Sequence, residues 1–133
     1  MAGSSIRSSF LNQVSVLEVV TSRQGRALVC RLAGELDLSS ADQVRRAVDG
    51  AMARHGVSDL VLDLSEVSFL DSSGVGVILG RYRRTRESGG RMALVAPPER
   101  LRPVLELAGI LQLVPAAASV GEATGLLTVG ARS

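Results

Sequence analysis

The chain has little of what disulfides, zinc sites and base-stacking surfaces require. Its 133 residues include one cysteine, one histidine, two phenylalanines, one tyrosine and no tryptophan. One cysteine cannot form an internal disulfide, and one cysteine with one histidine cannot build a structural zinc site. So few aromatic residues cannot supply a surface on which nucleic-acid bases stack. We therefore expect no metal, no cofactor and no direct nucleic-acid ligand.

Long apolar runs and lysine are missing as well. No stretch approaches the roughly 18 apolar residues of a membrane span, and residues 1–13 lack the apolar centre of a secretory signal. We therefore expect a cytoplasmic protein with no membrane contact.

Every basic residue is arginine. The chain has fifteen arginines and thirteen acidic residues, which gives a net charge of +2. So small an excess gives no general attraction to nucleic acid or anionic lipid.

What the chain does have is enough apolar sequence for one core, since 46% of its residues are hydrophobic. We predict a mobile tail at 1–13 and a single domain over 14–133. Apolar runs typical of strands occur at 14–20, 26–33, 60–64, 92–96 and 111–114, and helical spacing occurs at 40–56, 72–89, 101–109 and 119–129. Strands that alternate with helices indicate an α/β fold: a mostly parallel five-stranded sheet, an antiparallel N-terminal strand and four flanking helices.

Several local signals refine this prediction. Ser40 with Gln43, and Ser119 with Glu122, have the spacing of a capping box at the start of a helix. Pro103 predicts that the third helix begins late or bends in its first turn. Cys30 alternates with apolar neighbours along its strand, so we expect a buried thiol.

The most informative segment is Ser68 to Tyr82, which reads SFLDSSGVGVILGRY. It places Ser72 and Ser73 where a loop becomes a helix, and free backbone N–H groups with the helix dipole favour an anion there. Gly74 and Gly76 lack a Cβ, so another surface can approach the backbone closely. The alternative is that Ser72 or Ser73 simply caps the helix.

Two enzyme interpretations of this segment fit poorly. A dinucleotide-binding fingerprint needs its third glycine three residues after the second, whereas Gly80 follows Gly76 by four, and no acidic residue ends the next strand. A serine hydrolase needs a histidine base, and His55 is the only histidine.

The stretch FLDSSGVGVILGRY, preceded by GELD at Gly34 to Asp37, resembles the STAS domain of bacterial anti-sigma factor antagonists, most of all the sporulation (sigma-F) type. The resemblance runs from about Val14 to the C-terminus. The N-terminal extension, the all-arginine basic set and Pro103 depart from the family pattern, and none of them touches the serine motif.

This resemblance implies a partner-switching module that regulates transcription and is not an enzyme. The serine directly after aspartate, here Ser72, would accept a phosphoryl group from ATP bound to an anti-sigma factor serine kinase. The unmodified protein would bind that kinase and release the sigma factor, phosphorylation would break the complex, and a serine phosphatase would reset it. The partner-binding residues that the resemblance implies are Glu35, Asp37, Asp71, Ser73, Gly74, Gly76 and Arg81.

Simple electrostatics favours such a switch. Phosphorylation adds about −1.5 to −2 charges, and parallel strands that end at one sheet edge would bring Glu35 and Asp37 close to Ser72. Four alternatives stay open at this point. Glu35 and Asp37 could serve only as caps of the first helix. The arginines from Arg81 to Arg86 could form a solvated helix face rather than a kinase contact. The whole domain could be a non-switching STAS scaffold or a subunit of a transport complex, or it could be a small enzyme or nucleotide binder on the same fold.

Overall fold

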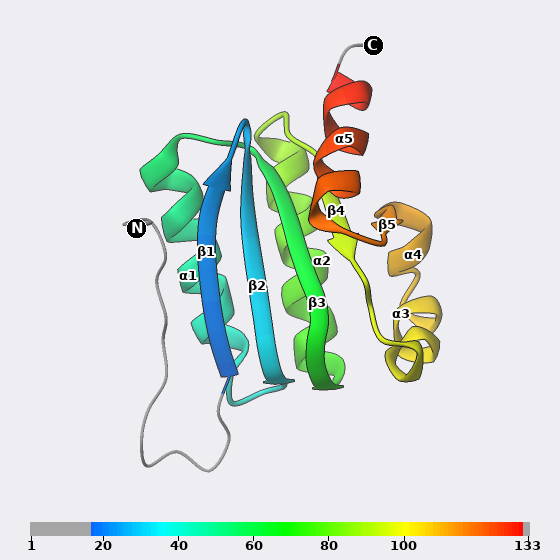
Figure 1. Cartoon of the computed structure of the whole chain (residues 1–133). Helices are drawn as coiled ribbons and strands as arrows, with labels where there is room; N and C mark the ends of the chain where they lie inside the picture. The colour runs from blue at the N-terminus through cyan, green and yellow to red at the C-terminus, as the bar shows by residue number, and fades with distance from the viewer. Residues whose placement is uncertain (1–16, 132–133) are drawn as a thin grey trace.

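The protein is described here by a computed structural model, which covers residues 17–131, with side chains described for residues 17–128. Strands β1 (Leu17–Gln24) and β2 (Ala27–Leu36) form an antiparallel hairpin, and β3 (Asp59–Leu70), β4 (Met92–Val95) and β5 (Ala116–Ala117) continue the sheet in parallel. The strand order is β1-β2-β3-β4-β5 (Figure 1). The predicted five-stranded α/β sheet with one antiparallel strand is confirmed.

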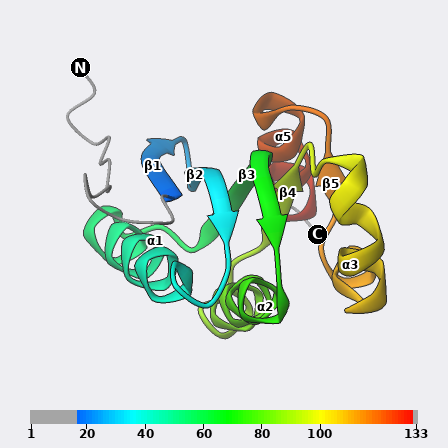
Figure 2. The ribbon, with the colours of Figure 1, turned by 90° about the horizontal axis from the view of Figure 1, so that it is seen from below.

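Helices cover the sheet unequally. Helices α1 (Ala41–His55) and α2 (Ser72–Glu87) lie side by side on one face, and α5 (Val120–Ala131) lies on the other (Figure 2). A 3-10 turn at Glu99–Leu101 leads into the short helices α3 (Arg102–Leu107) and α4 (Ile110–Leu113) beside the β4–β5 edge. Within residues 17–131 no helix is long and apolar enough to cross a membrane.

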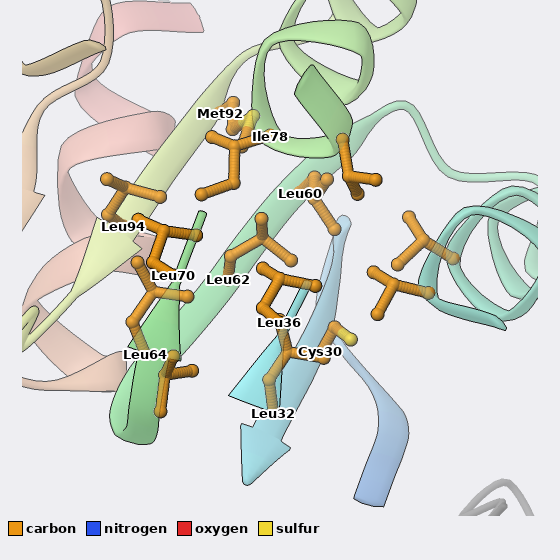
Figure 3. Close-up of a cluster of buried hydrophobic side chains, with 14 of the residues drawn as sticks. Cys30, Leu32, Leu36, Leu60, Leu62, Leu64, Leu70, Ile78, Met92 and Leu94 are labelled. Carbon is orange, nitrogen blue, oxygen red and sulfur yellow. The ribbon is translucent and has the colours of Figure 1, made fainter. Parts of the chain in front are cut away.

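The main core fills the layer between the sheet and the pair α1 and α2. Alternate residues of each strand point into it, as the two-residue repeat of a strand requires. Its fully buried side chains include Leu28, Cys30, Leu32, Leu36, Leu60, Leu62, Leu64, Ile78 and Leu94, most of which Figure 3 labels. A smaller cluster beneath α5 includes Val29, Val61, Val95, Ala123 and Leu127. Burial on both faces explains why Leu60, Val61 and Leu62 of β3 form an unbroken apolar run.

Cys30 is fully buried, as its alternation predicted. Burial, helped by the negative charge of Asp63, raises the pKa of its thiol to about 12. The thiol is therefore a core group, protonated at physiological pH and closed to solvent.

Four local expectations have different outcomes. Ser119 accepts a hydrogen bond from the Glu122 N–H at 3.1 Å, which confirms the cap of α5, and α3 begins just before Pro103 as expected. The capping box at Ser40 and Gln43 is wrong, because Gln43 instead donates to the Leu17 carbonyl at 2.9 Å. The strand expected at 111–114 is also wrong: these residues form the end of α4 and the start of the following turn, and the last strand is β5.

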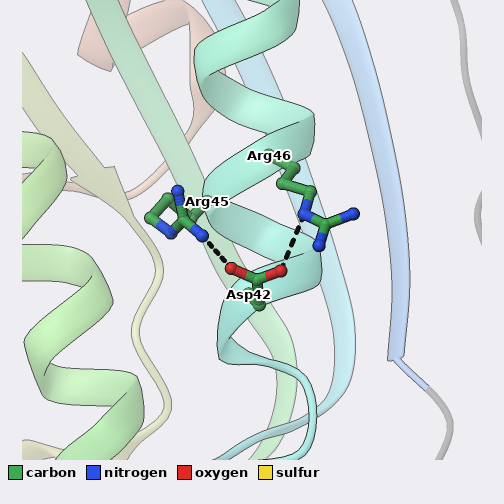
Figure 4. Close-up of polar contacts among 3 residues, drawn as sticks. All are labelled: Asp42, Arg45 and Arg46. Carbon is green, nitrogen blue, oxygen red and sulfur yellow. Dashed lines mark hydrogen bonds and ion pairs between the residues drawn. The ribbon is translucent and has the colours of Figure 1, made fainter.

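The exposed surface of α1 carries local ion pairs. Asp42 in the first turn pairs with Arg45 and, at 2.7 Å, with the Nε of Arg46 (Figure 4). The hydrogen bond from Arg45 is the main reason that the pKa of Asp42 is lowered. Pairs this exposed contribute little to stability, so the charge pattern here does not indicate a site. The expected tail at 1–13 lies outside the described residues, and the division into a tail and one domain stays a prediction.

Candidate functional site

The site is built where β2 and β3 end at the same edge of the sheet. Their parallel register places Glu35 opposite Phe69 and Leu36 opposite Leu70. One residue further, the N–H of Asp71 donates to the Leu36 carbonyl at 3.4 Å. The loop that leaves β2 therefore runs directly beside the loop that enters α2. The sheet itself brings the GELD and DSSG segments together, as their places at the strand ends indicated.

Asp71, rather than a serine, caps α2. Its backbone is extended, with φ −113° and ψ −170°, and its carboxylate accepts a hydrogen bond from the Gly74 N–H at 3.0 Å. Its carbonyl also accepts from the Val75 N–H at 2.9 Å. The interpretation of Ser72 or Ser73 as the cap is therefore wrong. Ser72 is the first residue of the helix and is exposed, and its hydroxyl bonds to no other residue of the described chain.

Gly74 fixes how closely the helix start approaches the strand ends. A Cβ built on this buried residue would lie 2.4 Å from the Leu36 carbonyl oxygen and 2.6 Å from a Leu70 methyl carbon. The missing side chain of Gly74 therefore lets α2 pack closely against β2 and β3 of the same chain rather than against a partner. Gly76 differs, because it is exposed and a Cβ there would meet nothing within 4 Å. Of these two glycines, only Gly76 leaves the outer side of α2 open to a partner.

The loop after β2 is shaped by Asp37. Its carboxylate accepts from the Ser39 hydroxyl at 2.8 Å, the Ser39 N–H at 3.0 Å and the Ser40 N–H at 3.2 Å. The hydroxyl of Ser39 is the main cause that lowers the pKa of Asp37. Ser40 in turn donates to the Glu35 carbonyl at 2.7 Å. Asp37 therefore orders the approach to α1 while its charge stays at the site, and the Glu35 side chain is exposed.

Two exposed apolar side chains lie on the segments that carry the site, and sequence reasoning missed both. Leu38, in the loop after β2, is 78% exposed, and Phe69, at the end of β3, is 48% exposed. Both lie on the segments that meet at this sheet edge. Apolar side chains exposed beside a polar motif are typical of a protein contact surface. A signal was available for Phe69, because it is one of only two phenylalanines and lies two residues before Asp71.

Arg81 lies away from this surface. Its side chain is 9% exposed between α1 and α2, and its Nε is 3.2 Å from the Asp49 Oδ1 of α1. Burial lowers the pKa of Arg81, and the negative charge of Asp49 opposes that shift. Arg84 approaches the same Asp49 oxygen at 3.7 Å and stays largely exposed. The structure thus gives Arg81 a position that holds α2 against α1.

The site combines a positive influence from the start of α2 with negative charge from nearby carboxylates. The first N–H groups of α2 and the positive end of its dipole favour an anion at Ser72. Asp37, Asp71 and Glu35 supply negative charge at the same sheet edge. A phosphate on Ser72 would be accommodated by the helix end while it made an already acidic surface more negative.

The chain belongs to the STAS domain family, whose model matches residues 18–123. Among its relatives, an anti-sigma F factor antagonist of Paenibacillus polymyxa is 39% identical over 101 residues, which cover 74% of this chain and 85% of the relative. Among solved structures, the anti-sigma factor antagonist SpoIIAA in its unphosphorylated form aligns with a TM-score of 0.72 and 30% identity, over 84% of this chain and 96% of that one. The Bacillus cell fate determinant SpoIIAA in its phosphorylated form aligns with a TM-score of 0.65 and 31% identity, over 80% and 96% of the two chains.

Proposed function

We propose that this protein is an anti-sigma factor antagonist whose affinity for an anti-sigma factor serine kinase is switched by phosphorylation of Ser72. The single observation that carries the proposal is the exposed Ser72 hydroxyl at the first position of α2, with Asp71 as the cap. A serine needed for capping would lose a structural bond on modification. Here modification leaves the cap intact, so the surface changes its charge without loss of fold.

The contact surface consists of the two segments that meet at the sheet edge. Leu38 and Phe69 supply apolar area, and the residues around Ser72 supply polar contacts. Gly76 leaves room on the outer side of α2. Gly74 and Arg81 act from behind this surface, Gly74 by its close packing and Arg81 through Asp49. The partner-facing residues in this proposal are Glu35, Asp37, Leu38, Phe69, Asp71, Ser72, Ser73 and Gly76.

Phosphorylation then weakens the complex by charge and desolvation. The phosphate adds about −1.5 to −2 charges to a surface that already holds Glu35 and Asp37. A loss of about 3 kcal/mol at the interface lowers affinity by roughly a hundredfold, which is enough for a switch. The kinase supplies the ATP and the base for the transfer, since phosphoryl transfer depends mainly on positioning. A serine phosphatase restores the unmodified state.

The test is the intact mass of the protein after incubation with ATP and its cognate anti-sigma factor kinase. We expect one phosphoryl group on the wild type and on Ser73→Ala, and none on Ser72→Ala. Ser73→Ala is the matched control because it removes the neighbouring hydroxyl and leaves the Asp71 cap in place.

Binding to the kinase completes the test. Ser72→Ala should bind at least as tightly as the wild type, whereas Ser72→Asp should bind about tenfold or more weakly, because even one added charge is repelled there. Equal binding by the two variants would refute the charge switch. Failure of a kinase that is active on a control antagonist to modify the wild type would favour the scaffold or transport-subunit alternative.

A further inference from the structure

A second surface on α2, beyond the one around Ser72, combines an apolar floor with unpaired positive charge. A shallow hollow of about 370 Å³ is lined by Leu79, Tyr82, Arg83 and Arg86 of α2 and by Leu113 of α4. We call these five residues the α2–α4 groove. Leu79 and Tyr82 are half-buried against the core, whereas Leu113 is 49% exposed. The groove therefore has apolar surface that the chain's own packing leaves open.

The charge of the groove has one sign. No carboxylate lines it, and within residues 17–128 neither Arg83 nor Arg86 forms an ion pair. Arg86 is held in place instead, because its Nη1 donates to the Tyr82 hydroxyl at 2.9 Å and its guanidinium lies 5.8 Å from the centre of that ring. An arginine ordered over an aromatic ring presents a fixed cation to a ligand.

The groove is also separate from the phosphoacceptor. At a rise of about 1.5 Å per residue, Leu79 lies ~10 Å and Arg86 ~21 Å along α2 from Ser72. The Debye length at physiological ionic strength is about 8 Å, so a charge on Ser72 is largely screened at the far end of the groove.

We propose that the α2–α4 groove is a docking site for an acidic amphipathic segment of a partner protein. An apolar side chain of that segment lies on Leu79, Tyr82 and Leu113, and its flanking carboxylates pair with Arg83 and Arg86. The docked segment stays bound whether or not Ser72 carries a charge. The inference needs no phosphorylation of Ser72, so it stands or falls independently of the proposed function.

The probe is a fluorescein-labelled 15-residue peptide of leucine and glutamate, with leucines at every third or fourth position, and its binding is followed by fluorescence anisotropy. We expect binding by the wild type and a loss of at least about tenfold for the double variant Arg83→Glu/Arg86→Glu. The matched control is Arg23→Glu/Arg26→Glu, which makes the same change in net charge at the exposed β1–β2 hairpin and should stay within twofold.

Three further measurements make the test decisive. In an NMR titration, the amide shifts should cluster at Leu79, Tyr82 and Leu113. Leu113→Ser should weaken peptide binding without a change in charge. Ser72→Asp should bind the peptide within twofold of the wild type. No binding at 1 mM peptide, equal binding of a peptide with lysine in place of glutamate, or equal losses in the two double variants would overturn the proposal. A tenfold loss on Ser72→Asp would also overturn it, because the peptide would then lie at the other end of α2.

Discussion

The substitution Gly74→Ala tests whether the junction between the strand ends and α2 is as tight as the structure indicates. The added methyl carbon would lie 2.4 Å from the Leu36 carbonyl oxygen, 2.6 Å from the Leu70 Cδ1 and 3.0 Å from the Leu36 Cγ. A leucine methyl can rotate away, but the carbonyl oxygen belongs to the backbone of β2. Relief of the contact therefore requires the first turn of α2 to move away from the strand end.

The expected cost follows from two opposing effects. Alanine in place of glycine within a helix stabilises by about 0.5–1 kcal/mol, because less backbone entropy is lost on folding. Overpacking of a close contact costs about 1–3 kcal/mol, and the backbone position of the clash favours the upper end. We expect Gly74→Ala to lower the free energy of unfolding by about 2 kcal/mol, or the Tm by about 8 °C for a domain of this size.

The chain supplies a matched control on the same helix. A Cβ built on Gly80 would meet nothing within 4 Å, so Gly80→Ala should keep the helix gain of about 0.5–1 kcal/mol without a clash. Urea unfolding followed by circular dichroism gives both values, and an unchanged m-value shows that the surface exposed on unfolding is the same. The two variants should thus differ by about 3 kcal/mol.

The same pair of variants connects packing to function. Displacement of the first turn should weaken the hydrogen bond from the Asp71 N–H to Leu36, so its amide should exchange faster in Gly74→Ala and not in Gly80→Ala. Phosphorylation of Ser72 should slow in Gly74→Ala alone. Equal stability of the two alanine variants would refute the reasoning, because it would mean that the junction accommodates a methyl group.

Two further predictions concern buried ionisable groups. Asp49→Ala leaves the Arg81 cation unpaired between α1 and α2 and should lower the free energy of unfolding by about 2–3 kcal/mol, which is below the range for fully buried pairs because Asp49 is 20% exposed. The double variant Asp49→Ala/Arg81→Met should recover most of that loss in the same urea assay. No recovery would mean that the pair does not act as a unit. The pKa of Cys30 is raised to about 12 in the folded protein, so the folded state resists loss of the thiol proton. The free energy of unfolding, taken relative to that of Cys30→Ala, should therefore be constant below pH 9 and fall by up to about 1.4 kcal/mol per pH unit between pH 9 and 12. A difference between wild type and Cys30→Ala that does not change from pH 8 to 10.5 would contradict this assignment.

Much of the architecture was predictable because it depends on local patterns. The order of strands and helices follows from hydrophobic periodicity, and the sheet topology follows from their alternation. The meeting of the GELD and DSSG segments followed from the rule that parallel strands end at one edge. Where a short apolar run was ambiguous the prediction failed, since Ile110 to Leu113 fits a strand or a helix equally and the chain restarts a helix after Gly109.

The site was less predictable because its details depend on tertiary contacts. Aspartate and serine are both good caps, and only the extended backbone of Asp71 at the end of β3 decides between them. The pattern of arginines on α2 did not reveal that Arg81 faces inward, since its partner Asp49 comes from another helix. The exposure of Leu38 depends on a loop conformation that Asp37 and the serines set.

The two ends of α2 therefore have different physical properties, and this difference bears on how one helix can serve a switch. At its first turn, backbone N–H groups would favour a phosphate on Ser72, while Glu35 and Asp37 make the surface acidic. At its last turns, Arg83 and Arg86 face solvent beside apolar side chains. Between the two ends, the ion pair of Arg81 and Asp49 holds α2 against α1, so both surfaces are carried on one fixed helix. If Ser72 is phosphorylated as proposed, the phosphate would act through the local field at its own end of α2, and a partner docked in the α2–α4 groove would be retained.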